Sequence, residues 1–316
     1  MPRLGREKIY IGAEAKHGKT YAWMVIAKHL IPTGVKFVVI QSDDGVSKVA
    51  AELGVKIVNS DANGNVMPMP PNLSGPGLYV YPTFREWKEA YSYFDKIETW
   101  EAQRTLGNND WVVVEGLDII RTVTSGEFAD RTAGLWDKPV DRKIAPSSWE
   151  AFINKRNDKR PILEGTDWNA IDTEIGKCLD YICYQARFNI LATTGIEAAP
   201  EGQYGASKSA TETQAWYAAM GMPVHFRGQR DYVRKFDTLI LLGKSIGQGY
   251  TFQVFGDRGA TMRNQNPNNR QVPPIMLHQD FYNDFLVKMA GWPMAESQPA
   301  LVNNGASPVP PPPRLP

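Results

Sequence analysis

A strand, a loop and a helix near the start of the chain constrain its fold more than any other feature. A short apolar strand over residues 8–11 leads into the loop Ala13-Glu-Ala-Lys-His-Gly-Lys-Thr20, and an amphipathic helix over residues 20–30 follows directly. The loop fits the phosphate-binding pattern GxxxxGK[ST] with one change, because Ala13 stands at the first glycine position and Gly12 precedes it. The flanking strand and helix are the context that such a loop requires.

Each part of this loop has a defined role in holding a nucleotide. Backbone N–H groups curl around a phosphate at the positive end of the helix, and Gly18 lets the backbone approach closely. Lys19 places a positive charge between the β- and γ-phosphates, and Thr20 offers a hydroxyl to Mg²⁺. We therefore predict that ATP and Mg²⁺ bind here, through Ala13, Glu14, Ala15, Lys16, His17, Gly18, Lys19 and Thr20.

The rest of the chain alternates strand and helix patterns. Strands are expected over residues 36–41, 55–58, 78–81, 110–115 and 188–193, and helices over 47–53, 84–104, 167–187 and 280–289. Continuous apolar strands separated by helices predict an α/β fold, with a mostly parallel sheet covered by helices on both faces. Two later apolar segments, 237–242 and 250–255, are expected to pair as C-terminal antiparallel strands.

Two long polar stretches interrupt this alternation, at residues 122–165 and 195–228. Loops of that length inside a domain are usually functional or flexible. Residues 291–316 form a proline-rich tail, expected to be disordered because it lacks the apolar residues of a core. The expected organisation is one domain over residues 1–290 followed by this tail.

Composition excludes several classes of protein. The 35 Lys and Arg residues nearly cancel the 34 Asp and Glu residues, so a polybasic nucleic-acid binder is excluded, although a local basic patch is not. Only Cys178 and Cys183 are cysteines, which excludes a disulfide scaffold and favours reduced, buried thiols. No apolar run approaches the roughly 18–20 residues of a membrane span, and no signal peptide is evident, so we expect a cytoplasmic protein.

Acidic and hydroxyl residues follow the predicted strands and are candidates for the chemistry of hydrolysis. Glu115 ends the strand 110–115 and is the expected second metal-side ligand beside Thr20, with Asp118 as the alternative. Asp43 and Asp44 follow the strand 36–41, and Asp43 is favoured as the group that orients or deprotonates water. Thr193 and Thr194 stand at the end of the strand 188–193 and are candidate γ-phosphate sensors, with Thr194 preferred.

The order of these parts resembles the RecA-type P-loop ATPases. It is most similar to the phage-encoded AAA-type nucleotide-binding proteins of the single-strand annealing and recombination group. The similarity covers roughly residues 8–265 and is anchored by the loop 13–20, by Val-Val-Ile-Gln-Ser-Asp-Asp at 38–44 and by Val-Val-Val-Glu-Gly-Leu-Asp at 112–118.

The resemblance implies roles for particular residues. The acidic residue after the second strand activates water in that family, which implies this role for Asp43. Glu115 stands where relatives carry aspartate, and Thr194 stands where they often carry glutamine or histidine. Such ATPases complete their sites across a subunit interface with an arginine, and Arg258 and Arg263 are the candidates here, with Arg258 preferred.

The resemblance also implies partners. In RecA-type recombinases the loops corresponding to residues 122–165 and 195–228 contact DNA. The first carries many cations with Trp136 and Trp149 among them, a composition suited to single-stranded DNA. A homo-oligomeric ring or filament and viral recombination or replication proteins are further expected partners. The cluster of Arg227, Arg230, Arg234 and Lys235 favours the solvated face of a helix.

The sequence therefore predicts an ATPase that acts in viral or phage DNA recombination or replication inside the host cell. One alternative is a viral genome-packaging or helicase-type motor. Another is a nucleotide-gated assembly protein with little hydrolysis, which the departures at Glu115 and Thr194 keep open.

Overall fold

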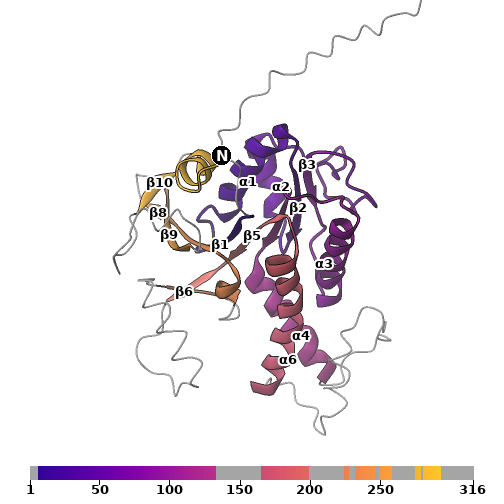
Figure 1. The fold of residues 1–316 in the computed structure, drawn as a ribbon. Coiled ribbons are helices and arrows are strands. Elements are labelled where there is room, and N and C mark those ends of the chain that lie inside the picture. The colour runs from indigo at the N-terminus through magenta and orange to yellow at the C-terminus, as the bar shows by residue number, and fades with distance from the viewer. Residues whose placement is uncertain are drawn as a thin grey trace, which may run out of the picture.

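A mostly parallel sheet forms the centre of the molecule (Figure 1). The structure, a computed structural model, describes residues 6–132, 165–198, 224–227, 232–245, 249–257, 275–278 and 280–292. Within these residues the sheet has eight strands, which are β1 (Lys8–Gly12), β2 (Lys36–Gln41), β3 (Gly77–Val80), β4 (Trp111–Glu115), β5 (Asn189–Thr194), β8 (Thr238–Ser245), β9 (Gly249–Asp257) and β10 (Met276–His278). Their order across the sheet is β10-β9-β8-β1-β5-β4-β2-β3.

The strands from β8 to β3 run parallel to one another, whereas β9 is antiparallel to both β8 and β10. The predicted α/β class, the mostly parallel sheet and the C-terminal antiparallel pair are thus confirmed. β1 lies between β5 and β8, so that Ile11 stands opposite both Thr193 and Ile240. The predicted phosphate loop therefore leaves the sheet from a central strand.

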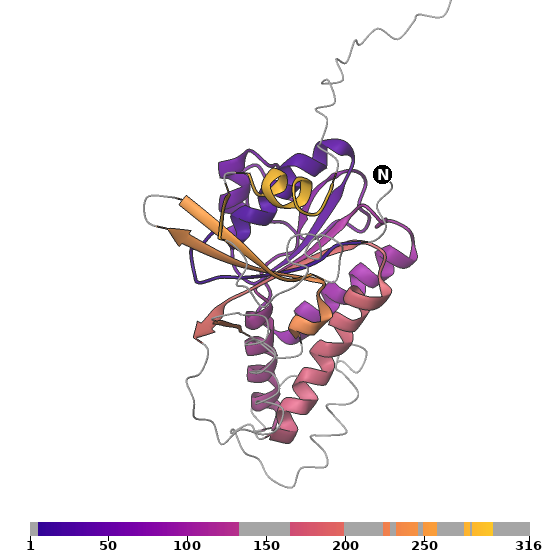
Figure 2. The same ribbon diagram turned by 60° about the vertical axis from the view of Figure 1, so that its left-hand side comes forward.

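Helices cover both faces of the sheet, as expected (Figures 1 and 2). One face carries α1 (Lys19–Leu30), α2 (Gly45–Leu53) and the π-helical segment η4 (Tyr282–Val287), and the other carries α3 (Trp87–Ala102), α4 (Leu117–Thr132) and α6 (Gly165–Asp180). Alternate side chains of a strand point to opposite faces. In β4, Val113 packs in the core under α1, whereas Val112 and Val114 pack in the core under α3 and α4.

The two interrupting stretches contain regular structure that the sequence did not predict. In the first, α4 continues to Thr132, because Ile120, Thr124 and Phe128 are buried at helical spacing. In the second, β6 (Ile196–Ala198) and β7 (Val224–Phe226) pair as a separate antiparallel sheet. The prediction of loops over 122–165 and 195–228 was therefore wrong at these ends, and residues 133–164 and 199–223 lie outside the described residues.

Other boundaries differ as well. The strand expected over residues 55–58 is reduced to a single bridge between Ile57 and Leu78, and Val58 is 44% exposed beside the edge strand β3. The helix expected over 167–187 becomes π-helical in η2 (Tyr181–Gln185), and short 3-10 turns occur at η1 (Ile31–Thr33) and η3 (Tyr232–Lys235). Cys178 and Cys183 are buried and unpaired, as expected. Within the described ranges, no helix has the length and apolarity needed to cross a membrane.

Candidate functional site

A cavity of about 1040 Å³ opens at the carboxyl ends of β1, β2, β4 and β5. Its wall includes Lys19 from the start of α1, Asp43 after β2, Glu115 at the end of β4 and Thr193 at the end of β5. The hairpin formed by β8 and β9 adds Tyr250 to the rim. Ligands of open α/β sheets bind at this edge, so the cavity is the candidate site.

The predicted phosphate loop has the backbone geometry of an anion-binding turn. Lys16 and Gly18 adopt left-handed φ angles of 64° and 84°, and Gly18 caps the N-terminus of α1. A side chain at Gly18 would be strained, and its Cβ would lie 3.1 Å from the Tyr250 ring. Of the eight predicted loop residues, Ala15, Lys16, Gly18, Lys19 and Thr20 line the cavity, whereas Ala13, Glu14 and His17 do not.

The loop offers several backbone donors. The His17 N–H bonds to the Glu14 carbonyl at 3.4 Å, and the Ala22 N–H bonds to Gly18. Among the described residues, no acceptor faces the N–H groups of Ala15, Lys16, Gly18, Lys19 or Thr20. Uncompensated N–H groups at a helix N-terminus form a ready site for an anion.

Ala13 and Gly12 explain the departure from the usual loop pattern. Ala13 is fully buried and is not among the described residues with a positive φ, so its position does not require glycine. Gly12 instead allows a close approach, because a Cβ there would lie 2.3 Å from the Phe226 ring. The glycine is therefore needed one position earlier, for packing against β7.

Lys19 lies inside the cavity, folded back over its own loop. Its Nζ donates to the carbonyls of Ala13 at 3.0 Å and Glu14 at 3.1 Å. Burial lowers the pKa of Lys19, and the nearby carboxylates, Glu115 foremost, oppose that shift. A phosphate in the loop would offer this ammonium group a charged partner in place of two neutral carbonyls.

Glu115 connects β4 to helix α1. Its Oε1 accepts a hydrogen bond from the Thr20 hydroxyl at 2.7 Å, and its Oε2 accepts one from the Trp23 indole N–H. Burial raises the pKa of Glu115, while these two donors oppose the shift. The structure thus brings together Thr20 and Glu115, the two residues predicted to face a metal ion.

Asp43 and Asp44 occupy different environments. Asp43 lines the cavity, and its Oδ1 accepts the Gly45 N–H at 2.8 Å. Asp44 stands at the N-cap of α2 without a capping hydrogen bond from its side chain, and accepts instead from Thr83 at 2.9 Å. The position of Asp43 is compatible with its predicted role toward water.

Thr193, not Thr194, is the threonine on the cavity wall. Both threonines are fully buried, but Thr194 does not line the cavity, and its hydroxyl donates to the Arg227 carbonyl at 2.9 Å. Thr193 accepts the Gly116 N–H at 3.0 Å beside Glu115. The geometry therefore does not bring the Thr194 hydroxyl to the site, because a parallel strand turns successive side chains to opposite faces.

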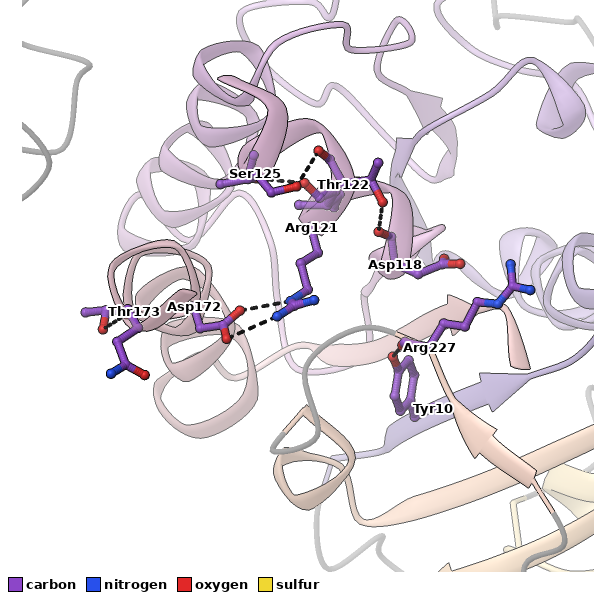
Figure 3. A network of polar contacts seen from close by, with 11 residues as sticks. Tyr10, Asp118, Arg121, Thr122, Ser125, Asp172, Thr173 and Arg227 are labelled. Carbon is purple, nitrogen blue, oxygen red and sulfur yellow. Dashed lines mark hydrogen bonds and ion pairs between the residues drawn. The ribbon is translucent and has the colours of Figure 1, made fainter. Parts of the chain in front are cut away.

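The cavity wall also contains residues that sequence analysis missed or misread. Arg227 follows β7 on the wall instead of lying on a helix face, and its side chain extends on the same side as Asp118, whereas Arg121 turns away toward Asp172 (Figure 3). Tyr250, from the hairpin, stacks on Tyr21 with ring centroids 6.1 Å apart. The position of β8 beside β1 and the pairing of β7 with β6 place these residues beside the loop, so local patterns could not reveal them.

Several predicted residues lie outside the described residues. These include Arg258, Arg263, Trp136, Trp149 and most cations of the stretch 122–165. Arg121, at the edge of that stretch, pairs with Asp172 at 2.9 Å and lies over the Trp168 ring at 4.4 Å. It therefore ties α4 to α6.

The described residues contain no group of three or more His, Cys, Asp or Glu side chains placed to hold a metal ion. Mg²⁺ that binds with a nucleotide needs only one or two protein ligands besides the phosphates and water. The Thr20 hydroxyl and the Glu115 carboxylate suit that smaller set.

No protein-family model matches the chain, and no curated protein matches it. The function is therefore inferred from the site itself.

Proposed function

We propose that the chain is a RecA-type P-loop ATPase that binds ATP with Mg²⁺ in this cavity and hydrolyses it. One observation carries the proposal: the loop that ends in Thr20 and the strand that ends in Glu115 meet through a 2.7 Å hydrogen bond at the floor of the cavity. A chance match to the loop pattern gives no reason for the Glu115 carboxylate to lie against the Thr20 hydroxyl, the group expected to face Mg²⁺.

Different residues of the site would bind the phosphates, the metal ion and the nucleobase. The N–H groups of Gly18, Lys19 and Thr20 hold the phosphates, and Lys19 Nζ leaves its loop carbonyls to contact them. Thr20 and Glu115 would hold Mg²⁺, which neutralises phosphate charge when bound. The stacked Tyr21 and Tyr250 rings offer an aromatic wall to the nucleobase.

Asp43 is the proposed group that orients the attacking water. It lies on the cavity wall after β2, and one carboxylate oxygen is fixed by Gly45, so the other can face a water beside the terminal phosphate.

We further propose that hydrolysis serves viral or phage DNA recombination or replication, with single-stranded DNA bound by a homo-oligomeric ring or filament. This part is supported by the resemblance of the motif order. Because the net charge is only +1, DNA binding would depend on local cations and should weaken as salt rises.

A second candidate, a nucleotide-gated assembly protein with little hydrolysis, is favoured by one observation. Thr194, at the expected sensor position, donates its hydroxyl to the Arg227 carbonyl and does not line the cavity. A site without that sensor would still bind nucleotide through its loop.

The test is ATP turnover by the purified full chain, with and without single-stranded DNA. The Lys19→Ala variant should lose turnover, and Lys28→Ala, an exposed lysine on the same helix, is the matched control. Turnover that rises with DNA supports the recombination or replication role. Tight ATP binding without turnover supports the assembly protein, and equal turnover of Lys19→Ala and wild type would overturn the ATPase proposal.

A further inference from the structure

Arg227 is held at the cavity by its backbone. Its N–H bonds to the Gly195 carbonyl at 2.8 Å, and its own carbonyl accepts from Thr194 at 2.9 Å and from Tyr10 at 3.4 Å. These contacts join the end of β7 to β5 and β1, the two strands beside the phosphate loop (Figure 3). The Cα of Arg227 therefore has a defined place at the carboxyl edge of the sheet.

The side chain of Arg227 is exposed on the cavity wall and has no ion-pair partner within the described part of the chain. It passes beside Gly195: a Cβ built on that glycine would lie 2.9 Å from Arg227 Cδ and 2.9 Å from Asp118 Oδ2. Asp118 is itself fixed by the Gly195 N–H at 3.2 Å. The glycine thus leaves room for the Arg227 side chain on the cavity wall that the phosphate loop also lines, without an ion pair to the neighbouring Asp118 among the described residues.

The cavity lining has groups that suit different parts of a nucleotide. Tyr21 and Tyr250 form its aromatic rim, and carboxylates, Glu115 foremost, act on Lys19. A nucleobase suits the aromatic rim, whereas the terminal phosphate belongs beside Lys19 and the metal ligands. Arg227 and Lys19 both line this cavity, so two cations face the same region.

We propose that Arg227 contacts the terminal phosphate of the bound nucleoside triphosphate from within the same chain, which makes it a catalytic residue and the source of preference for tri- over diphosphates. The inference rests on the proposed function and adds to it a charge that needs no neighbouring subunit. In hydrolysis, the water oxygen bonds to the γ-phosphorus and the bond from that phosphorus to the β–γ bridging oxygen breaks, giving ADP, inorganic phosphate and a proton. Arg227 exchanges no proton in this step and stabilises the charge on the phosphoryl oxygens.

The test compares ADP with a non-hydrolysable ATP analogue, using Mg²⁺ and the full chain. In calorimetric titrations, Arg227→Ala should bind ADP within about twofold of wild type, while its preference for the ATP analogue over ADP should fall about 10-fold. Its ATP turnover should fall about 100-fold. Arg227→Lys should recover part of the preference, because it keeps charge but loses the fork of donors. Arg85→Ala, an exposed arginine that does not line the cavity, should behave as wild type.

A second variant tests position separately from charge. Gly195→Ala keeps Arg227 but forces its side chain and that of Asp118 to move. It should therefore also reduce the preference for the ATP analogue over ADP. If Arg227→Ala does not fold, Arg227→Gln, which keeps most of the length without the charge, decides the question. An unchanged preference in folded Arg227 variants overturns the inference alone. A wild-type protein that binds neither nucleotide overturns the proposed function and this inference together.

Discussion

The indole N–H of Trp23 donates a hydrogen bond to the buried carboxylate of Glu115. Thr20, three residues earlier in α1, donates to the other oxygen of the same carboxylate. Helix α1 thus satisfies both oxygens of the carboxylate at the end of β4. The length of the glutamate side chain and the position of the buried indole are matched, so we expect the effects of substitutions at the two residues to be coupled.

Shortening Glu115 should therefore destabilise the fold. In Glu115→Asp the carboxylate no longer reaches the fully buried Trp23, and an unsatisfied buried N–H costs about 1 to 3 kcal/mol of unfolding free energy. Urea denaturation of Glu115→Asp, Trp23→Phe and the double variant measures the coupling. The double variant should lose about 1 kcal/mol less than the sum of the single losses, and strictly additive losses would count against the match.

Asp43→Asn should separate binding from hydrolysis. Asparagine keeps an oxygen for the Gly45 N–H, so the start of α2 should be unchanged, but it can no longer take a proton from water. We expect turnover to fall by about 10²- to 10⁴-fold with ATP affinity preserved. Asp44→Asn is the matched control, since Asp44 bonds to Thr83 and does not line the cavity. Equal turnover in the two variants would move the water-activating role to Asp118.

Much of the fold could be predicted from the sequence because it depends on local patterns. The apolar runs of β2, β4 and β5 are buried on both faces, and the loop 13–20 is defined by its own residues. The residues around Thr124 and Phe128 were misread, because charged neighbours concealed a helical spacing of buried side chains.

The walls of the site were harder to predict. Thr20, Asp43 and Glu115 were found because each follows a strand or belongs to the loop pattern. Tyr250 and Arg227 were not, because they reach the cavity only through the position of β8 beside β1 and the pairing of β7 with β6. Thr194 was chosen over Thr193 because sequence alone does not determine which of two adjacent side chains faces the ligand.

Position 13, the first glycine position of the loop pattern, should tolerate either alanine or glycine. Ala13→Gly restores the usual pattern, but the alanine backbone is already unstrained, so nucleotide affinity should stay within about twofold. Gly18→Ala should instead destabilise the fold by about 1 to 2 kcal/mol, because it places a Cβ at a φ of 84°. Its affinity for ATP should also fall as the new methyl group meets Tyr250. Thermal unfolding measures the stability of the two variants, and nucleotide titration measures their affinity for ATP. A loss of affinity in Ala13→Gly would contradict the conclusion that this position does not require a particular residue.

Glu101 should make stability depend on acid pH. Its burial alone would raise the pKa, but three hydrogen bonds outweigh it and hold the pKa below the ordinary value of 4.5. The Tyr181 hydroxyl donates one of them, and Arg187 donates the other two, from its backbone N–H at 2.9 Å and from Nε at 3.1 Å. For a carboxyl with a lowered folded pKa, the stabilisation is complete above the unfolded pKa and is lost as pH falls through the folded pKa.

The unfolding free energy of the wild type should therefore decrease as pH drops below about 4.5, the ordinary glutamate value. Glu101→Gln should be less stable at neutral pH and should lose less stability over the same interval, because the titrating group is absent. Urea denaturation of both proteins between roughly pH 3 and pH 7 measures the difference. Parallel curves for the two proteins across that interval would show that Tyr181 and Arg187 do not favour the ionised form of Glu101.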